Sequence, residues 1–263
     1  MAGHHHGEGR APEGTVLAVC GKGGVGKTTV SALLARLFSA RKNGRVLFVD
    51  ADPAVGLGMA LSIFPEHTVN DIREEIISVV KERATDSLDL AASVDYKLMQ
   101  AVHQDGRLGF LSVGRPEDEG CYCQLNTLLR EAIEALSAHF ELTLIDAEAG
   151  VEQINRRVMR SVSHLLLVCD PTPKSLKVAE TIRKVAEEAV NYRKLGLLVN
   201  RARGEGEALA LAARSDLPLL GWIPEDETVR EFDSGARSFL ELPSCQALRA
   251  VEEAVLGGRF LDM

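Results

Sequence analysis

The sequence predicts an α/β fold: a single doubly wound domain with a mostly parallel sheet of roughly seven strands and helices on both faces. Two observations support this prediction. Short apolar runs of strand length alternate with stretches of helical spacing along most of the chain. One of these runs, 163–169, is apolar almost throughout, which is typical of a parallel strand covered on both sides.

Composition and charge limit the classes of function. The chain has 263 residues, 46% of them hydrophobic, and a formal net charge of −8. The acidic balance argues against a nucleic-acid-binding surface. Because no apolar run reaches the length of a membrane span and no secretory core is present, we expect a cytoplasmic protein without stable membrane anchoring. Residues 1–14, with three adjacent histidines, resemble a tag or a disordered tail, so we expect the folded domain over 15–263.

A glycine-rich loop follows the first strand-like run, 15–20, and leads into a helical pattern over 30–38. Glycines let several backbone N–H groups turn toward one anion, and the helix N-terminus adds a partial positive charge. Lys27 supplies a charge for the β- and γ-phosphates, and the Thr28 hydroxyl is placed to bind Mg²⁺. The predicted phosphate-binding residues are Gly21, Lys22, Gly23, Gly24, Val25, Gly26, Lys27, Thr28 and Thr29.

Carboxylates end two further strand-like runs. Asp50 and Asp52 follow the apolar residues of 45–49, and Asp146 ends the run 141–146. Ligands of open α/β sheets bind at the carboxyl ends of the strands, and Asp146 suits a carboxylate that holds Mg²⁺ through water. An ordinary Asp-Pro turn is a second reading of Asp52, and it does not exclude a catalytic role.

The five cysteines divide into two groups. Cys20, Cys169 and Cys245 are scattered, and we expect them to fill the core. Cys121 and Cys123 lie at the start of a helix predicted over 124–139, a position that favours thiolate. Such a pair supplies half of a four-coordinate soft-metal site, so the missing ligands must come from another copy, a partner protein or solvent. A redox pair and a buried structural pair remain alternatives.

Lys22 narrows the class of phosphate loop. The segment KGGVGKTT resembles the deviant phosphate loop of the family that contains the MinD and ParA partitioning ATPases and the nitrogenase iron protein. The resemblance implies an ATPase that dimerises around ATP, with Lys22 reaching the partner's phosphates. It further implies that Asp52 positions the attacking water, that Asp50 lies near the magnesium shell, and that the backbone of Gly150 senses the γ-phosphate.

The same resemblance implies where the adenine base binds. Asn200 and Arg201, which end the run 195–200, match the family's adenine-contacting pair, and an amide can pair with the donor and acceptor edge of a purine. The segment 221–226 resembles the loop that lies against the base, which adds Ile223 and Pro224 to the predicted ATP-binding residues.

The cysteine pair sharpens the resemblance. Together with the later segment 146–152, the segment 120–123 resembles the nickel-inserting accessory ATPases of carbon monoxide dehydrogenase, the CooC family. The resemblance implies that Cys121 and Cys123 bind Ni²⁺ or Zn²⁺ between two protomers and that the client is carbon monoxide dehydrogenase or a related nickel enzyme. Ligand softness does not choose between the two metals.

Two other functions remain open. A partitioning or positioning ATPase acts as a nucleotide-dependent switch on a membrane or on DNA, and it predicts an amphipathic basic C-terminal helix or a basic patch. The tail over 254–263 is short and only singly basic, which argues against the membrane form. An electron-transfer reductase like the nitrogenase iron protein carries its cluster on widely separated cysteines, which the adjacent pair does not match. The polar helical stretch 68–104 is expected to be an insertion over the nucleotide side.

Overall fold

The computed structural model describes residues 14–41, 43–82, 87–115, 123–147, 158, 161–258 and 260–261. Its strands form one eight-stranded sheet in the order β3-β4-β2-β5-β1-β6-β7-β8, parallel except for the pairing of β3 with β4. The strands are β1 (Thr15–Gly21), β2 (Val46–Asp50), β3 (His103–Asp105), β4 (Leu108–Ser112), β5 (Leu142–Asp146), β6 (His164–Cys169), β7 (Lys194–Asn200) and β8 (Leu219–Ile223).

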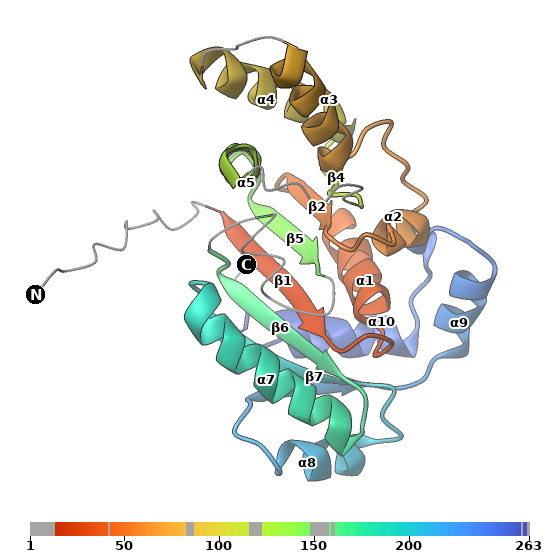
Figure 1. Ribbon diagram of the computed structural model, residues 1–263. Coiled ribbons are helices and arrows are strands. Elements are labelled where there is room, and N and C mark those ends of the chain that lie inside the picture. Colours follow the sequence, from red (N-terminus) through yellow and green to blue (C-terminus); the bar gives the residue numbers. More distant parts are fainter. Residues whose placement is uncertain are drawn as a thin grey trace, which may run out of the picture.

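Helices cover both faces of this sheet (Figure 1). One face carries α3, α4, α5, α7 and α8, and the other carries α1, α2, α9, α10 and two short turns. The helices are α1 (Lys27–Ser39), α2 (Gly56–Leu61), α3 (Val69–Glu82), α4 (Ser87–Ala101), α5 (Cys123–Ser137), α7 (Pro173–Ala189), α8 (Glu205–Ala212), α9 (Glu227–Ser234) and α10 (Gln246–Val251), with a 3-10 turn η1 (Phe239–Glu241) and a π-helical turn η2 (Glu252–Leu256).

The central strand β1 shows why the apolar runs become strands. Ala18 and Cys20 belong to the hydrophobic core on one face, and Leu17 and Val19 belong to the core on the other. Since side chains alternate across a strand, a run that is apolar at every position must be covered on both faces. The predicted doubly wound, mostly parallel α/β sheet is confirmed, with the short antiparallel β3 as the strand that the sequence did not predict.

The stretch 68–104 forms a helical hairpin of α3 and α4 followed by β3. Val94 and Leu98 of α4 are buried in the same core as Leu129 of α5, so the hairpin extends the layer of helices on the α5 face. Figure 1 shows it at one end of the molecule, beyond α5. Among the described residues, no helix has both the length and the hydropathy needed to cross a membrane.

The strand order places the functional edge of the sheet. β1 lies between β5 and β6. The strands β2 to β5 lie on one side of β1, and the strands β6 to β8 lie on the other. Asp50 of β2 and Asp146 of β5 are paired in register at the carboxyl ends of neighbouring strands. This edge, where β1 runs into the glycine-rich loop, is where a doubly wound sheet binds its ligands.

Candidate functional site

The glycine-rich loop joins β1 to α1 in a conformation that glycine makes accessible. Gly24 and Gly26 have φ angles of 83° and 90°, in the left-handed region that other residues rarely adopt. A Cβ atom on Gly26 would lie 2.4 Å from Nδ2 of Asn200. The loop therefore needs glycine at position 26 both for its backbone angle and for the close approach of β7.

Lys27 is the first residue of α1, and its side chain turns back across the loop. Its Nζ lies 3.4 Å from the carbonyl oxygen of Lys22, and the residue is only 8% exposed. The ammonium group is thus held at the loop, where backbone N–H groups and a helix N-terminus favour an anion. A single protomer does not display contacts across a dimer, so the action of Lys22 on a partner stays a prediction.

Two hydroxyls of α1 converge on the carboxylate of Asp146. Thr28 Oγ1 donates to one carboxylate oxygen and Ser31 Oγ donates to the other, each at 2.8 Å. Asp146 is fully buried. Burial raises its pKa to about 6, against the lowering effect of the two hydroxyl hydrogen bonds and of Lys27. The predicted neighbours Thr28 and Asp146 are therefore in direct contact.

Asp50 is a second buried carboxylate beside this cluster. It accepts hydrogen bonds from the backbone N–H of Gly58 at 3.0 Å and of Asp52 at 3.2 Å. Burial raises its pKa to about 7, and the nearby charge of Asp146 adds to the shift. Two buried carboxylates on adjacent strands are costly as anions unless a cation accompanies them.

These groups fit a magnesium ion. Thr28, Asp50 and Asp146 offer one hydroxyl and two carboxylates at the carboxyl edge of β2 and β5, and oxygen is the ligand atom that Mg²⁺ prefers. A bound divalent cation would also offset the burial of both carboxylates. The fit therefore rests on the donor set and on its buried charge.

Asp52 lies one residue beyond the buried edge. Its side chain is partly exposed and accepts a hydrogen bond from the N–H of Ala54 at 2.9 Å, and its carbonyl accepts one from Val55. The Asp-Pro turn that the sequence predicts is thus formed. The role of Asp52 in positioning water stays a prediction.

A cavity of about 540 Å³ opens beside the glycine-rich loop, at the ends of β7 and β8. The residues that line it include all four that we expected near the adenine base: Asn200, Arg201, Ile223 and Pro224. Thr29 of α1, one of the predicted phosphate-binding residues, lines it as well. One expectation is wrong in detail. Residues 221–223 belong to β8 and are not a loop, because they continue the pairing with β7 as far as Asn200. Only the part from Pro224 onward leaves the sheet.

Asn200 and Arg201 also brace the phosphate loop. Asn200 Nδ2 donates to the carbonyl of Val25 at 2.8 Å, and Arg201 Nη1 donates to the carbonyl of Gly24 at 3.2 Å. Asn200 is 5% exposed, and one N–H of its amide is used inside the protein. The expected pairing with a purine stays a prediction, and the side chain has in addition a structural role that the sequence did not predict.

Two further residues were missed. Ser31 lies one helical turn after Thr28, and this spacing placed both hydroxyls on one face of α1. Asp226 caps α9 by accepting from Thr228 and Val229, and its second oxygen accepts from the N–H of Ala247 at 2.9 Å. Asp226 thereby ties the walls of the base cavity together. An aspartate just before a helical pattern is a signal for the first of these contacts.

The predicted metal ligands lie at the margin of the described structure. Cys121 and Gly150 lie outside the described residues, and α5 begins at Cys123, as the helix prediction required. Within the described ranges, no group of three or more His, Cys, Asp or Glu side chains is arranged to hold a metal ion.

The other three cysteines behave as core residues. Cys20, Cys169 and Cys245 are buried. Burial raises the pKa of the Cys20 and Cys169 thiols to about 12, which keeps them neutral and unreactive. The prediction that these three residues fill the core is therefore confirmed.

Known proteins resemble the chain over most of its length. An uncharacterised ATP-binding protein of Methanocaldococcus jannaschii is 34% identical over 90% of this chain and 96% of its own length. The carbon monoxide dehydrogenase accessory protein CooC of Rhodospirillum rubrum is 28% identical over 88% of this chain and 91% of its own. The crystal structure of the cell division ATPase MinD of Pyrococcus furiosus has the same fold, with a TM-score of 0.67 and 24% identity, covering 92% of this chain and 97% of that one.

A family model described as the CobQ/CobB/MinD/ParA nucleotide binding domain matches residues 16–239. The match includes the phosphate loop, both buried carboxylates and the base cavity up to Asp233. The chain therefore belongs to this family of nucleotide-binding domains.

Proposed function

We propose that the chain is a Mg²⁺-dependent ATPase that dimerises on ATP and delivers nickel to carbon monoxide dehydrogenase or a related nickel enzyme. The observation that supports the ATPase is the contact of Thr28 and Ser31 with the buried Asp146 directly beneath the phosphate loop. Together with Asp50, this cluster offers two buried carboxylates and a hydroxyl, which suit a metal ion bound to a phosphate chain.

Each residue of the site has a separate task in this proposal. The loop N–H groups and Lys27 bind the β- and γ-phosphates, while Thr28, Asp50 and Asp146 hold Mg²⁺. When bound, Mg²⁺ supplies positive charge that neutralises the phosphate oxygens. Asp52 orients the attacking water from the partly exposed edge of the cluster.

Four further residues complete the proposed ATP site. Gly150 senses the γ-phosphate, and Lys22 reaches the phosphates bound to the partner protomer, so hydrolysis depends on the dimer. Asn200 and Arg201 hold the loop while Asn200 presents its oxygen to the base.

The cargo site rests on Cys121 and Cys123. α5 begins at Cys123, and the partial positive charge of a helix N-terminus favours thiolate, the form that binds a soft metal. The 28% identical carbon monoxide dehydrogenase accessory protein CooC supports carbon monoxide dehydrogenase or a related enzyme as the client. Two protomers facing each other would supply four thiolates, and a change of the dimer on hydrolysis would release the metal.

A second candidate is a partitioning or positioning ATPase. It is supported by the septum site-determining protein MinD of Helicobacter pylori, 26% identical over 92% of this chain, and by the MinD-like fold. In this function the nucleotide switches the affinity for a surface, and no metal cargo is carried. The cysteine pair separates the two candidates.

The test is metal stoichiometry against oligomeric state under anaerobic conditions, with and without ATP. The parent protein is compared with a Cys121→Ser/Cys123→Ser double variant, and a Cys245→Ser variant serves as a matched control at a cysteine far from the pair in sequence. A truncated protein without residues 1–14 shows how much of the bound metal is held by the three adjacent histidines. The metals used are Ni²⁺ and Zn²⁺.

The nickel proposal expects one metal ion per ATP-bound dimer, lost in the double variant while hydrolysis of ATP and binding by the control variant persist. If the double variant binds as much metal as the parent, the cargo proposal is wrong and the positioning ATPase is the better account. Loss of hydrolysis in every variant would instead contradict the assignment of the ATP site.

A further inference from the structure

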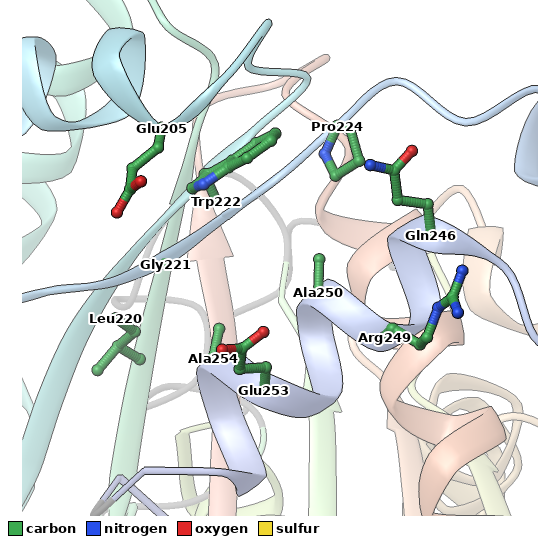
Figure 2. A pocket seen from close by; sticks show the side chains of 10 residues that line it. All are labelled: Glu205, Leu220, Gly221, Trp222, Pro224, Gln246, Arg249, Ala250, Glu253 and Ala254. Atoms are coloured by element: carbon green, nitrogen blue, oxygen red, sulfur yellow. The ribbon is translucent and has the colours of Figure 1, made fainter.

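A second cavity, of about 600 Å³, lies between β8 and the C-terminal helical segment (Figure 2). Its lining comes from β8 on one side and from α10 and η2 on the other, with one residue from α8. Pro224 borders both this cavity and the base cavity. Nothing in the proposed ATPase mechanism uses it.

The cavity follows the free edge of the sheet. β8 is the last strand in the sheet order, so its outer edge has no strand partner in the described sheet. Trp222 packs with the core on the α8 face, whereas Leu220 packs with the core on the α10 face. Because both residues line one cavity, the cavity straddles the edge of the strand, and Gly221, which has no side chain, lies between them in the lining.

The helical wall is built to stay close to β8 without filling the space. Ala250 and Ala254 present only methyl groups to the cavity. A Cβ atom on Gly221 would lie 2.8 Å from the Cβ of Ala254, so η2 approaches the strand at this point as closely as glycine allows. Gly221 is therefore explained by its contact with Ala254, and the volume of the cavity lies beside that contact.

Two carboxylates stand at the rim of the cavity, and one of them, Glu205, lies in the first turn of α8. Glu205 of α8 and Glu253 of η2 line opposite sides of the strand edge, and neither makes an ion pair or a side-chain hydrogen bond in the part of the chain that the structure describes. Arg249 also borders the cavity, but Figure 2 shows its side chain pointing away from β8. The strand edge is therefore flanked by one carboxylate on each face.

We propose that this cavity is a docking site for an extended basic peptide of a partner protein, which adds to the sheet as a strand beside β8. Main-chain hydrogen bonds to a free strand edge are a known mode of peptide recognition. Successive side chains of a strand point to opposite faces, so two adjacent basic residues would meet Glu205 and Glu253 separately. An aliphatic stem or a cation above Trp222 adds contact with the indole ring.

The experiment uses fluorescence of Trp222, the single tryptophan of the chain. The probe is a synthetic peptide of alternating valine and threonine with two adjacent lysines at its centre. One control peptide has glutamate in place of both lysines, and a second has proline at a central position, which removes a main-chain donor. The lysine peptide is expected to change the fluorescence saturably and to bind about tenfold more tightly than either control, equivalent to about 1.4 kcal/mol.

Variants locate the binding. Ala250→Lys places a long cation in the cavity and should abolish the fluorescence response, whereas Ala210→Lys, the same change at an exposed position of α8 outside the cavity, should leave it unchanged. The pair Glu205→Gln and Glu253→Gln should remove the preference for lysine without changing the fold. Equal binding of all three peptides, or full binding by the Ala250→Lys variant, overturns the proposal.

Discussion

The two ends of the nucleotide site are built in different ways. At the phosphate end, Thr28, Ser31 and Asp146 are joined by hydrogen bonds of 2.8 Å around a fully buried carboxylate. At the base end, residues from the ends of β7 and β8 and from α9 and α10 surround a cavity of about 540 Å³. The phosphate end holds two buried carboxylates whose charge a bound cation would offset, while the base end offers space and shape.

The difference teaches where each kind of effect should appear. Substitutions at the phosphate end should change the chemistry or the charge balance of the protein. Substitutions at the base end should act through the geometry of the loop, because Asn200 and Arg201 reach the loop carbonyls from β7. The following predictions separate these two behaviours.

The largest effect is expected for Thr28→Ala. Removing the hydroxyl takes away a predicted magnesium ligand, and kcat for ATP hydrolysis should fall at least about 100-fold, the magnitude typical of losing one electrostatic contact to the reacting phosphate. Ser31→Ala removes the other hydroxyl on Asp146 but no predicted ligand, and kcat should stay within about threefold. Steady-state phosphate release measures both. Equal losses in the two variants would contradict the assignment of Thr28.

Gly26→Ala tests the junction between the two ends. The left-handed backbone is unfavourable for alanine by about 1–2 kcal/mol, and the new methyl group displaces the Asn200 amide, which adds a lost hydrogen bond. ATP affinity should fall about 100-fold by calorimetry. Gly206→Ala in α8 is the matched control outside the loop, since a Cβ there meets nothing within 4 Å, and it should bind ATP within about threefold of the parent.

Asp50→Asn should stabilise the protein in EDTA at pH 8. A pKa raised from 3.8 to about 7 means that the folded state disfavours the charged carboxylate by about 4 kcal/mol. The asparagine amide avoids this cost but accepts weaker hydrogen bonds, so the expected net gain in the free energy of unfolding is about 2 kcal/mol. Denaturant unfolding measures the gain.

The pH dependence has a definite sign. Because the folded pKa of Asp50 lies above the unfolded value, the folded state retains the proton between about pH 4 and pH 7, and stability is lost as the pH rises through this window. The Asp50→Asn variant should show a shallower loss. Asp52→Asn, at a partly exposed carboxylate, is the control, and a gain as large as that of Asp50→Asn would remove burial as the explanation.

The smallest effect is expected for the hydrogen bonds that Asn200 and Arg201 donate to the carbonyls of the phosphate loop. Asn200→Ala leaves the buried carbonyl of Val25 without its donor and should lower the free energy of unfolding by about 1 kcal/mol and ATP affinity about fivefold. Arg201→Ala removes a longer, exposed bond and should have less effect on stability. If Asn200→Ala weakened ATP binding without changing stability, direct contact with the base would be its main role.

Much of the fold and of the phosphate end was predictable from local sequence. The apolar run of β1, the glycines after it and the hydroxyl at Thr28 are near neighbours in the chain, and their chemistry depends on that proximity. The partnership of Ser31 with Asp146 joins residues 115 positions apart. It was not predicted, because a serine within a helix carries no local signal for a distant carboxylate.

The sequence by itself determined the parallel α/β architecture, the phosphate loop and the core positions of Cys20, Cys169 and Cys245, since each follows from periodicity or from short-range spacing. Only the tertiary structure decided that Asn200 braces Val25, that Asp226 ties α9 to α10 and that Glu205 and Glu253 flank one strand edge. The reason is physical: these contacts depend on strand order and helix packing, which place distant residues together with no pattern between them in the chain.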